Sequence, residues 1–157
     1  MIDLHCHMPP GIDDDARDLQ IALRIAELVV ADGITTPACT PHLYPGLVEN
    51  KHGDIRQAVE LFRGELKEVG IPLQLAYGAD IQVVPELARS LGDGTLPTLH
   101  ESRYLLFQPP HHVSLQGVSD VLHNARLAGY VPLITHPGRL TYIEADYDKR
   151  RHGGARI

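Results

Sequence analysis

The sequence predicts an α/β fold built on parallel strands, and three observations support that class. Short β-rich runs alternate with amphipathic stretches along almost the whole chain. The amphipathic stretches end at Gly33, Gly70 and Gly129, and glycine commonly follows the last turn of a helix. Polar residues stand at the carboxyl ends of the β-rich runs. Because a succession of strand, helix and strand favours parallel pairing with right-handed crossovers, we expect either an α/β barrel or an open doubly wound sheet.

The first half of the chain contains three predicted strands and two predicted helices. The strands are residues 1–7, 34–42 and 71–80. The first helix, 18–33, has Asp18 as its N-cap and a broad apolar face. The second helix, 54–69, carries apolar residues at helical spacing, namely Ile55, Ala58, Val59, Phe62, Leu66 and Val69.

The second half of the chain repeats the alternation. A short helix is expected from Pro85 through Leu91, and the sequence GDGTLP then turns the chain. Strands are expected at 103–110 and 130–139, with a helix between them marked by Val118, Val121, Leu122 and Ala125. The residues after Glu144 have no apolar periodicity. We therefore expect one domain over 1–144 and a disordered or out-of-frame tail over 145–157.

Composition excludes several classes of protein. The 157 residues include 14 basic and 20 acidic side chains, a formal net charge of −6, so no nucleic-acid partner is expected. The chain has no signal-peptide pattern, and no apolar run approaches the ~20 residues that span a bilayer. Cys6 and Cys39 are too few for a disulfide framework. We expect a cytoplasmic protein that does not span a membrane.

The predicted strands end in polar side chains that suit metal binding. In a parallel sheet these ends meet at one rim, where α/β folds place their sites. His5 and His7 are two residues apart, so on a strand they point to the same face, with Cys6 facing away. Imidazole together with carboxylate suits zinc, manganese or iron. The polar residues at this rim are His5, His7, His42, Asp80, Gln108 and His136, and the histidines with Asp80 are the candidate ligands.

Further candidates lie in the turns next to the strand ends. Asp14, in the DDDA run after the first strand, is the member of that run best placed to act as a ligand. We expect Asp13 and Asp15 to be solvated charges that cap the following helix. Arg139 offers a planar fork for a phosphate or carboxylate, with an exposed surface arginine as the alternative. Arg17 is a weaker candidate of the same kind.

Five motifs occur in order along the chain: DLHCHMPPGIDDDA, TPHLYPG, GAD at 78–80, YLLFQPP and THPGRL. Together they resemble the polymerase and histidinol phosphatase (PHP) superfamily, and within it the bacterial tyrosine phosphatases of capsular and extracellular polysaccharide synthesis. The resemblance runs from Met1 to about Glu144. It implies a distorted (β/α)7 barrel, similar to a TIM barrel, with up to three divalent ions at its carboxyl rim. Those ions are typically Mn²⁺, with Fe or Zn as alternatives.

The resemblance also implies a role for each candidate residue. The first ion would be held by His5, His7 and Asp80, the second by Asp80, Gln108 and His136, and the third by Asp14 and His42. Arg139 matches a catalytic arginine that binds phosphate, and Arg17 is a further candidate for the substrate. In such a site a hydroxide formed from metal-bound water attacks phosphorus in line, without a cysteine nucleophile.

The sequence departs from the family pattern at several positions, among them Asp80 and Gly138 where glutamate is common and Asp15 where glycine is usual, and two further departures bear most on activity. Gln108 stands where glutamate is usual, and an amide oxygen brings no negative charge to a metal. The chain stops at Ile157, before a late strand in which family members supply the pattern D-x-H. We therefore expect an incomplete barrel of about five strands. Its unpaired edge and uncovered helix faces favour self-association.

The leading functional hypothesis is metal-dependent hydrolysis of phosphotyrosine on the tyrosine-rich tail of a polysaccharide-assembly kinase. One alternative is a catalytically silent fragment that keeps the surface of the fold and binds partners, which Gln108 and the missing D-x-H favour. The other alternative is hydrolysis of a small phosphate monoester, because substrate choice on such a scaffold depends on the rim loops.

Overall fold

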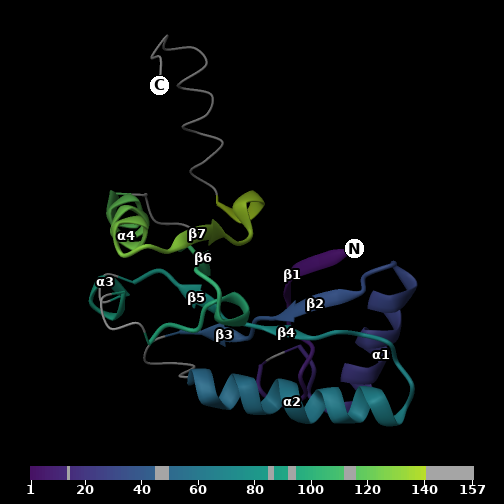
Figure 1. Ribbon diagram of the computed structural model, residues 1–157. Helices are drawn as coiled ribbons and strands as arrows, with labels where there is room; N and C mark the ends of the chain where they lie inside the picture. The colour runs from purple at the N-terminus through teal and green to yellow at the C-terminus, as the bar shows by residue number, and fades with distance from the viewer. Residues whose placement is uncertain (14, 45–49, 85–86, 92–94, 112–115, 141–157) are drawn as a thin grey trace.

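Parallel strands form the centre of the computed structural model, which describes residues 1–13, 15–44, 50–84, 87–91, 95–111 and 116–140 (Figure 1). The strands are β1 (Ile2–Cys6), β2 (Thr36–Cys39), β3 (His42–Leu43), β4 (Ala76–Tyr77), β5 (Asp80–Gln82), β6 (Tyr104–Gln108) and β7 (Val131–Ile134). The helices are α1 (Leu19–Ala31), α2 (His52–Glu68), α3 (Leu87–Ser90) and α4 (Gln116–Leu127), with short 3-10 turns η1 (Leu99–Glu101) and η2 (Pro137–Arg139). One sheet has the order β1-β2-β4 and the other β3-β5-β6-β7, and every pair is parallel. The structure confirms the predicted α/β class with parallel pairing.

Two of the five predicted strands each divide into two shorter strands. The run 34–42 forms β2 and β3, and the run 71–80 forms β4 and the start of β5. Pro41, which has no backbone N–H to donate, stands at the first break, and Gly78 stands at the second. A hydrogen bond from Asp80 N to the Pro41 carbonyl, at 3.1 Å, joins the segments beyond these breaks. The two sheets therefore continue into each other, with their strand segments in chain order.

The helix ends follow the signals that the sequence predicts. The Asp18 carboxylate accepts a hydrogen bond from the backbone N–H of Ile21 at 2.9 Å, which caps α1. Gly33, Gly70 and Gly129 follow α1, α2 and α4 with φ of +77°, +76° and +90°, a left-handed conformation that glycine adopts at low cost. No helix in the described part of the chain has the length and apolarity needed to cross a membrane.

The main core lies between the sheets and the helices. Figure 1 shows α1 and α2 beside the three-stranded sheet and α3 and α4 beside the four-stranded sheet. The largest fully buried apolar side chains of this core are Phe62, Phe107, Met8, Ile55, Leu66, Ile81, Leu105 and Val59. A smaller cluster of Ala38, Leu99 and Leu106 lies on the other face of the sheets. Successive side chains along β2 and β6 point to opposite faces, so some of their apolar residues pack on that side.

The last predicted strand, 130–139, is shorter than the sequence indicates. β7 stops at Ile134, and the residues after His136 form the turn η2. Pro137 has no N–H for a strand ladder, and His136 has φ of 48°, which is outside the extended region. The chain therefore turns at the carboxyl end of β7 instead of extending past it.

Several predictions concern residues outside the described ranges. These are the start of the short helix at Pro85, the domain boundary at Glu144 and the tail 145–157. The described helix α3 confirms a short helix in the region after Pro85.

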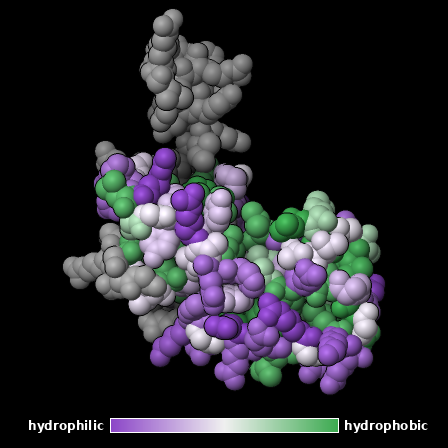
Figure 2. All heavy atoms as spheres, viewed as in Figure 1, coloured by the Kyte–Doolittle hydropathy of each residue, from purple (hydrophilic) through white to green (hydrophobic). Residues whose placement is uncertain are grey.

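Apolar side chains are exposed along β1, the edge strand of its sheet. Ile2 and Leu4 have 66% and 50% of their surface exposed. Figure 2 shows hydrophobic groups at the molecular surface in the region of β1. Such adjacent apolar groups on a strand edge are a common basis for association.

Candidate metal centre

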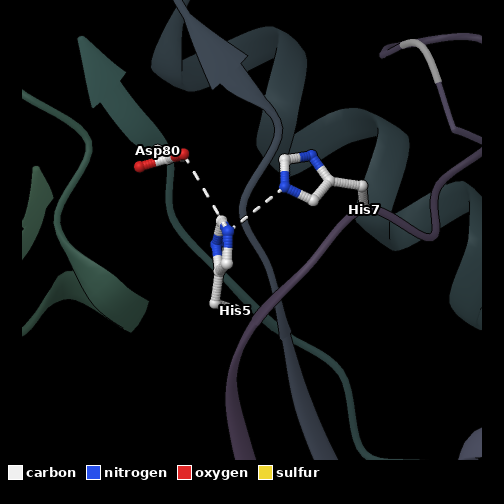
Figure 3. Close-up of side chains that lie close together, drawn as sticks. All are labelled: His5, His7 and Asp80. Carbon is white, nitrogen blue, oxygen red and sulfur yellow. Dashed lines mark hydrogen bonds and ion pairs between the residues drawn. The ribbon is translucent and has the colours of Figure 1, made fainter. Parts of the chain in front are cut away.

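Three histidines and one aspartate meet at the carboxyl ends of the strands. His5 is on β1 and His7 follows it two residues later, so the alternation of the strand directs both rings to the same side. Asp80 begins β5, and His136 follows β7. Figure 3 shows the His7 ring and the Asp80 carboxylate both directed toward His5. Segments far apart in the sequence therefore converge at one rim, as predicted.

The spacing of the donor atoms suits one metal ion. His5 Nε2 lies 3.1 Å from His136 Nε2, 3.5 Å from His7 Nε2 and 3.9 Å from Asp80 Oδ2. Ligand atoms that each lie about 2.1 Å from a shared ion are roughly 3 to 3.5 Å apart. His5, His7 and Asp80 offer ligand atoms that all lie within 4.8 Å of one another. Imidazole nitrogen and carboxylate oxygen are the donor types that zinc, manganese and iron share.

The Asp80 carboxylate gives the strongest indication of a cation. The side chain is fully buried, and its Oδ1 accepts a hydrogen bond from the Thr135 hydroxyl at 2.8 Å. Its Oδ2 has no hydrogen-bond donor among the described residues, and it faces His5 Nε2 and His42 Nδ1 at 3.9 and 3.5 Å. A buried carboxylate oxygen without a donor is costly unless a positive charge lies beside it. A divalent ion between these groups would satisfy it, so the residues fit a metal.

A second group of donors adjoins the first. His7, Asp13 and His42 also offer ligand atoms that lie within 4.8 Å of one another. The rings of His7 and His42 have their centroids 4.6 Å apart. His42 of this second group also approaches Asp80 of the first, with its Nδ1 3.5 Å from Asp80 Oδ2. This arrangement provides donors for more than one ion.

Asp13 takes part in the site, and the prediction that it is a solvated charge is wrong. Its side chain is only 5% exposed, and its Oδ2 lies 2.6 Å from His7 Nδ1. The same oxygen accepts a hydrogen bond from the backbone N–H of His42 at 2.7 Å. The turn after β1 folds back over the rim and buries this carboxylate. The sequence signal was present, because Asp13 lies in the turn assigned to the rim, but an acidic run before a helix equally suits capping.

Hydrogen bonds behind the rings set which nitrogen faces the cluster. When His7 Nδ1–H donates to Asp13, Nε2 keeps its lone pair for a metal. His5 Nδ1 lies 2.8 Å from the hydroxyl of Thr40, which is itself fully buried and donates to the Cys6 carbonyl at 3.5 Å. His5 therefore donates a hydrogen bond to Thr40 through Nδ1, and its Nε2 is the unprotonated nitrogen that faces the cluster.

Burial favours the neutral form of two of these rings. Burial is the largest cause of a lowered pKa at His5, with the positive forms of the neighbouring histidines adding to it and the charge of Asp80 opposing it. Burial also lowers the pKa of His136, and the Arg139 guanidinium adds to that effect. A neutral imidazole is the form that binds metal.

Cys6 does not take part in this cluster. Its thiol donates to the Ala38 carbonyl at 3.2 Å, and its Cα is paired with that of Cys39 on β2. A hydrogen bond with Cys39 and burial raise the pKa of the Cys6 thiol far above its usual range. A thiol held in its neutral form is a poor nucleophile. The geometry agrees with the expectation that Cys6 faces away from the histidines.

The remaining candidates are placed around this centre. Arg139 is exposed on η2, three residues after His136, and its backbone N–H donates to the His136 carbonyl at 2.9 Å. Arg17 is exposed in the segment between β1 and α1. Gln108 ends β6 and is buried, and its Oε1 accepts a hydrogen bond from the Tyr44 hydroxyl at 2.8 Å. Asp14 lies outside the described residues.

The fold and the site define a parallel α/β protein that gathers histidine and aspartate side chains able to hold a metal ion at the carboxyl ends of its strands. The model of the family described as capsular polysaccharide synthesis, CpsB/CapC, matches residues 1–152. This chain therefore belongs to the CpsB/CapC family.

Named relatives and a solved structure agree with this assignment. The chain is 32% identical over 139 residues to the tyrosine-protein phosphatase YwqE of Bacillus subtilis, covering 88% of this chain and 55% of YwqE. It is 29% identical over 144 residues to the tyrosine-protein phosphatase CpsB of Streptococcus pneumoniae, covering 92% of this chain and 59% of CpsB. A chain from the crystal structures of YwqE and CpsB, described as unique metal-dependent tyrosine phosphatases, matches with a TM-score of 0.86 and 31% identity. That match covers 92% of this chain and 59% of the solved chain, so this chain spans somewhat more than half the length of these relatives.

Proposed function

We propose that this protein is a metal-dependent phosphatase that hydrolyses phosphotyrosine in proteins. The observation that carries the proposal is the convergence of His5, His7 and His136 on the buried Asp80 carboxylate, whose Oδ2 has no hydrogen-bond donor among the described residues. Membership of the CpsB/CapC family, with relatives named tyrosine-protein phosphatases, supports the substrate class.

The proposed cofactor is Mn²⁺, up to three divalent ions, with Fe and Zn as alternatives. His5, His7 and Asp80 would hold the first ion, with His136 beside them for the second, and His42 with Asp13 lies where the third ion would bind. When bound, divalent ions supply positive charge for the phosphoryl oxygens and lower the pKa of a coordinated water. The described side chains leave the imidazole lone pairs and one carboxylate oxygen available for this purpose.

Residues around the centre position the ligands and the substrate. Thr40 and Asp13 fix the rings of His5 and His7, and Thr135 fixes the Asp80 carboxylate. Arg139 is proposed to bind the phosphoryl oxygens through its planar guanidinium and to neutralise charge as tyrosine leaves.

Three further site residues stay proposals. Asp14 is proposed as a ligand of the third ion, and Arg17 as a second contact for the phosphorylated substrate. Gln108 is proposed as a neutral ligand of the second ion, because an amide oxygen that accepts one hydrogen bond from Tyr44 keeps another lone pair.

The proposed natural substrate is the tyrosine-rich tail of a cytoplasmic kinase that controls polysaccharide assembly. The family description, capsular polysaccharide synthesis, supports this assignment. The scaffold is proposed to be a distorted (β/α)7 barrel of the PHP type, a proposal that the parallel strand segments in chain order support.

Phosphate release from a phosphotyrosyl peptide by the Mn²⁺-loaded chain tests the proposed activity. We expect turnover that requires the metal and is lost in a His5→Ala, His7→Ala variant. Turnover equal to that of this variant would contradict the proposal and support the catalytically silent alternative. Release of phosphate from a small alkyl phosphate but not from the peptide would support the alternative function, hydrolysis of a small phosphate monoester.

We also propose that copies of this chain associate through the β1 edge. The exposed Ile2 and Leu4 side chains and the edge position of β1 support this interaction. Sedimentation analysis should show a concentration-dependent dimer that an Ile2→Lys, Leu4→Lys variant weakens. A monomer at all concentrations would contradict it.

A further inference from the structure

A pocket of about 380 Å³ opens at the carboxyl rim beside the metal centre. It is lined by residues at or just after the ends of β3, β5 and β6, among them Tyr44, Val84, Gln108, Pro109, Pro110 and His111. Its volume is near the lower end of the roughly 300 to 1,000 Å³ of small-molecule pockets. A single aromatic ring fits within this volume.

The strand register places this pocket one layer beyond the metal centre. Asp80 pairs with His42 across β3 and β5, and Gln82 pairs with Gln108 across β5 and β6. Gln82 lies two residues after Asp80 on the same face of β5, a separation of roughly 7 Å. Tyr44 lies two residues after His42, and their rings stack at 4.8 Å between centroids with 22° between planes. A group attached to a phosphoryl at the metal centre can therefore reach the pocket.

The walls of the pocket favour an uncharged flat group. Two prolines, one valine and one tyrosine supply apolar surface, and none of its lining residues carries a fixed charge. Aromatic rings pack well against the faces of tyrosine and against aliphatic carbon. A charged substituent would lose its water there without gaining an opposite charge.

A hydrogen-bonded set of side chains forms the boundary between the pocket and the metal centre. The Tyr44 hydroxyl donates to Gln108 Oε1 at 2.8 Å, and Gln108 Nε2 lies 3.4 Å from His111 Nε2. Gln108 is only 5% exposed, so these two contacts hold its amide in place. The boundary therefore consists of a phenol, an amide and an imidazole that hold one another in place.

We propose that this pocket binds the aromatic ring of an aryl phosphate ester while its phosphoryl group occupies the metal centre. The inference rests on the proposed phosphatase function and assigns its preference for aryl esters to Val84, Pro109, Pro110 and the Tyr44 ring. The ring of phosphotyrosine separates phosphorus from the peptide backbone and enters the pocket. The short side chain of phosphoserine leaves it empty.

Binding of two non-hydrolysable phosphonates to the Mn²⁺-loaded full chain tests the pocket. Calorimetric titration should show phenylphosphonate binding at least about tenfold more tightly than methylphosphonate, a difference of about 1.4 kcal/mol. A Val84→Trp variant, which fills the pocket, should reduce this ratio toward one without weakening methylphosphonate. The matched control is Val69→Trp, at an exposed position after α2, which should keep the ratio.

The outcomes separate this inference from the proposed function. Equal affinities for the two phosphonates in the unmodified chain, or no binding of either, would overturn the pocket assignment, even if the phosphotyrosyl peptide is hydrolysed. Preferential binding of phenylphosphonate that Val84→Trp abolishes would support the pocket even if no phosphate is released, in which case the proposed activity alone fails. If the Val84→Trp chain does not fold, the comparison of the two phosphonates on the unmodified chain still decides.

Discussion

The histidines of the metal centre are oriented by partners that lie behind them. Thr40 holds Nδ1 of His5 at 2.8 Å, and Asp13 holds Nδ1 of His7 at 2.6 Å. Such partners fix the tautomer of a metal-binding histidine and raise the basicity of the ligand nitrogen. The Asp13 carboxylate, which was not among the predicted ligands, therefore orients the His7 ring.

Asp13→Asn should weaken metal binding by about 10- to 100-fold, because the amide removes the charge that orients His7. Competition with a chromophoric chelator measures the affinity. Asp15→Asn makes the same change of charge at an exposed position two residues away and should have little effect. Equal affinities in the two variants would show that Asp13 does not position His7.

Tyr77 provides a test of pH dependence away from the metal centre. Its ring is buried, its hydroxyl donates to Glu101 Oε1 at 2.6 Å, and burial, followed by this hydrogen bond, raises the pKa of the phenol. A pKa that is higher in the folded state means that the folded state holds the proton more tightly. Its contribution to stability is therefore complete below the ordinary tyrosine pKa of about 10 and declines as the pH rises above it.

Tyr77→Phe should lower the free energy of unfolding by about 1 kcal/mol at neutral pH, because it removes one hydrogen bond to a charged acceptor. It should also reduce the loss of stability between about pH 9 and about pH 11. Urea unfolding across this pH range measures both effects. Tyr104→Phe, at a side chain that is 43% exposed, is the control. An unchanged alkaline profile in Tyr77→Phe would contradict this account.

At the scale of the elements, the breaks within two strand runs decide how the sheets bend. Gly78 stands between β4 and β5, where a Cβ would lie 2.9 Å from Leu99 Cδ2 and 3.4 Å from Thr40 Cγ2. The absence of a side chain therefore allows η1 to pack closely against the strand. Thr40 also contacts His5, so this packing supports the metal centre.

Gly78→Ala should lower the free energy of unfolding by about 1 to 3 kcal/mol, because Leu99 and Thr40 must shift. Gly64→Ala is the matched control, since Gly64 lies within α2 and a Cβ there meets no atom within 4 Å. That control should raise stability by up to about 1 kcal/mol through helix propensity. Chemical denaturation of both variants measures the difference, and a loss of the same size in both would contradict the packing argument.

At the scale of the whole molecule, the metal centre joins segments from both ends of the described chain. His5 on β1 and His136 after β7 are 131 residues apart and have their Nε2 atoms 3.1 Å apart. A ligand that binds only the folded state stabilises it by an amount that grows with the logarithm of the ligand concentration above its dissociation constant. The bound metal is therefore expected to stabilise the fold as well as to serve the proposed reaction.

Mn²⁺ at about 100 times its dissociation constant should add about 2.7 kcal/mol to the free energy of unfolding. A chelator should remove this gain, and thermal melts with and without the metal measure it. The His5→Ala, His7→Ala variant is expected to show no dependence on the metal. A melting temperature that Mn²⁺ raises equally in that variant would place the binding elsewhere.

Local patterns predict much of this fold because the relevant forces act over a few residues. The cap at Asp18 and the glycines after α1, α2 and α4 depend on nearby backbone groups, and each is where the sequence indicates. The division of two strand runs was not predicted, because apolar content continues through Pro41 and Gly78. The turn at Pro137 was not predicted either, although the apolar run ends at Ile134 and Pro137 and Gly138 are typical turn residues.

The sequence by itself determined the parallel α/β class, the order of the elements and the convergence of His5, His7, Asp80 and His136. It did so because alternation and strand direction place all strand ends at one rim. Only the tertiary structure decided that Asp13 is buried against His7 and that Asp80 Oδ2 has no hydrogen-bond donor among the described residues. These facts depend on how the turn after β1 folds over the rim and on distances between residues remote in sequence, which no local pattern specifies.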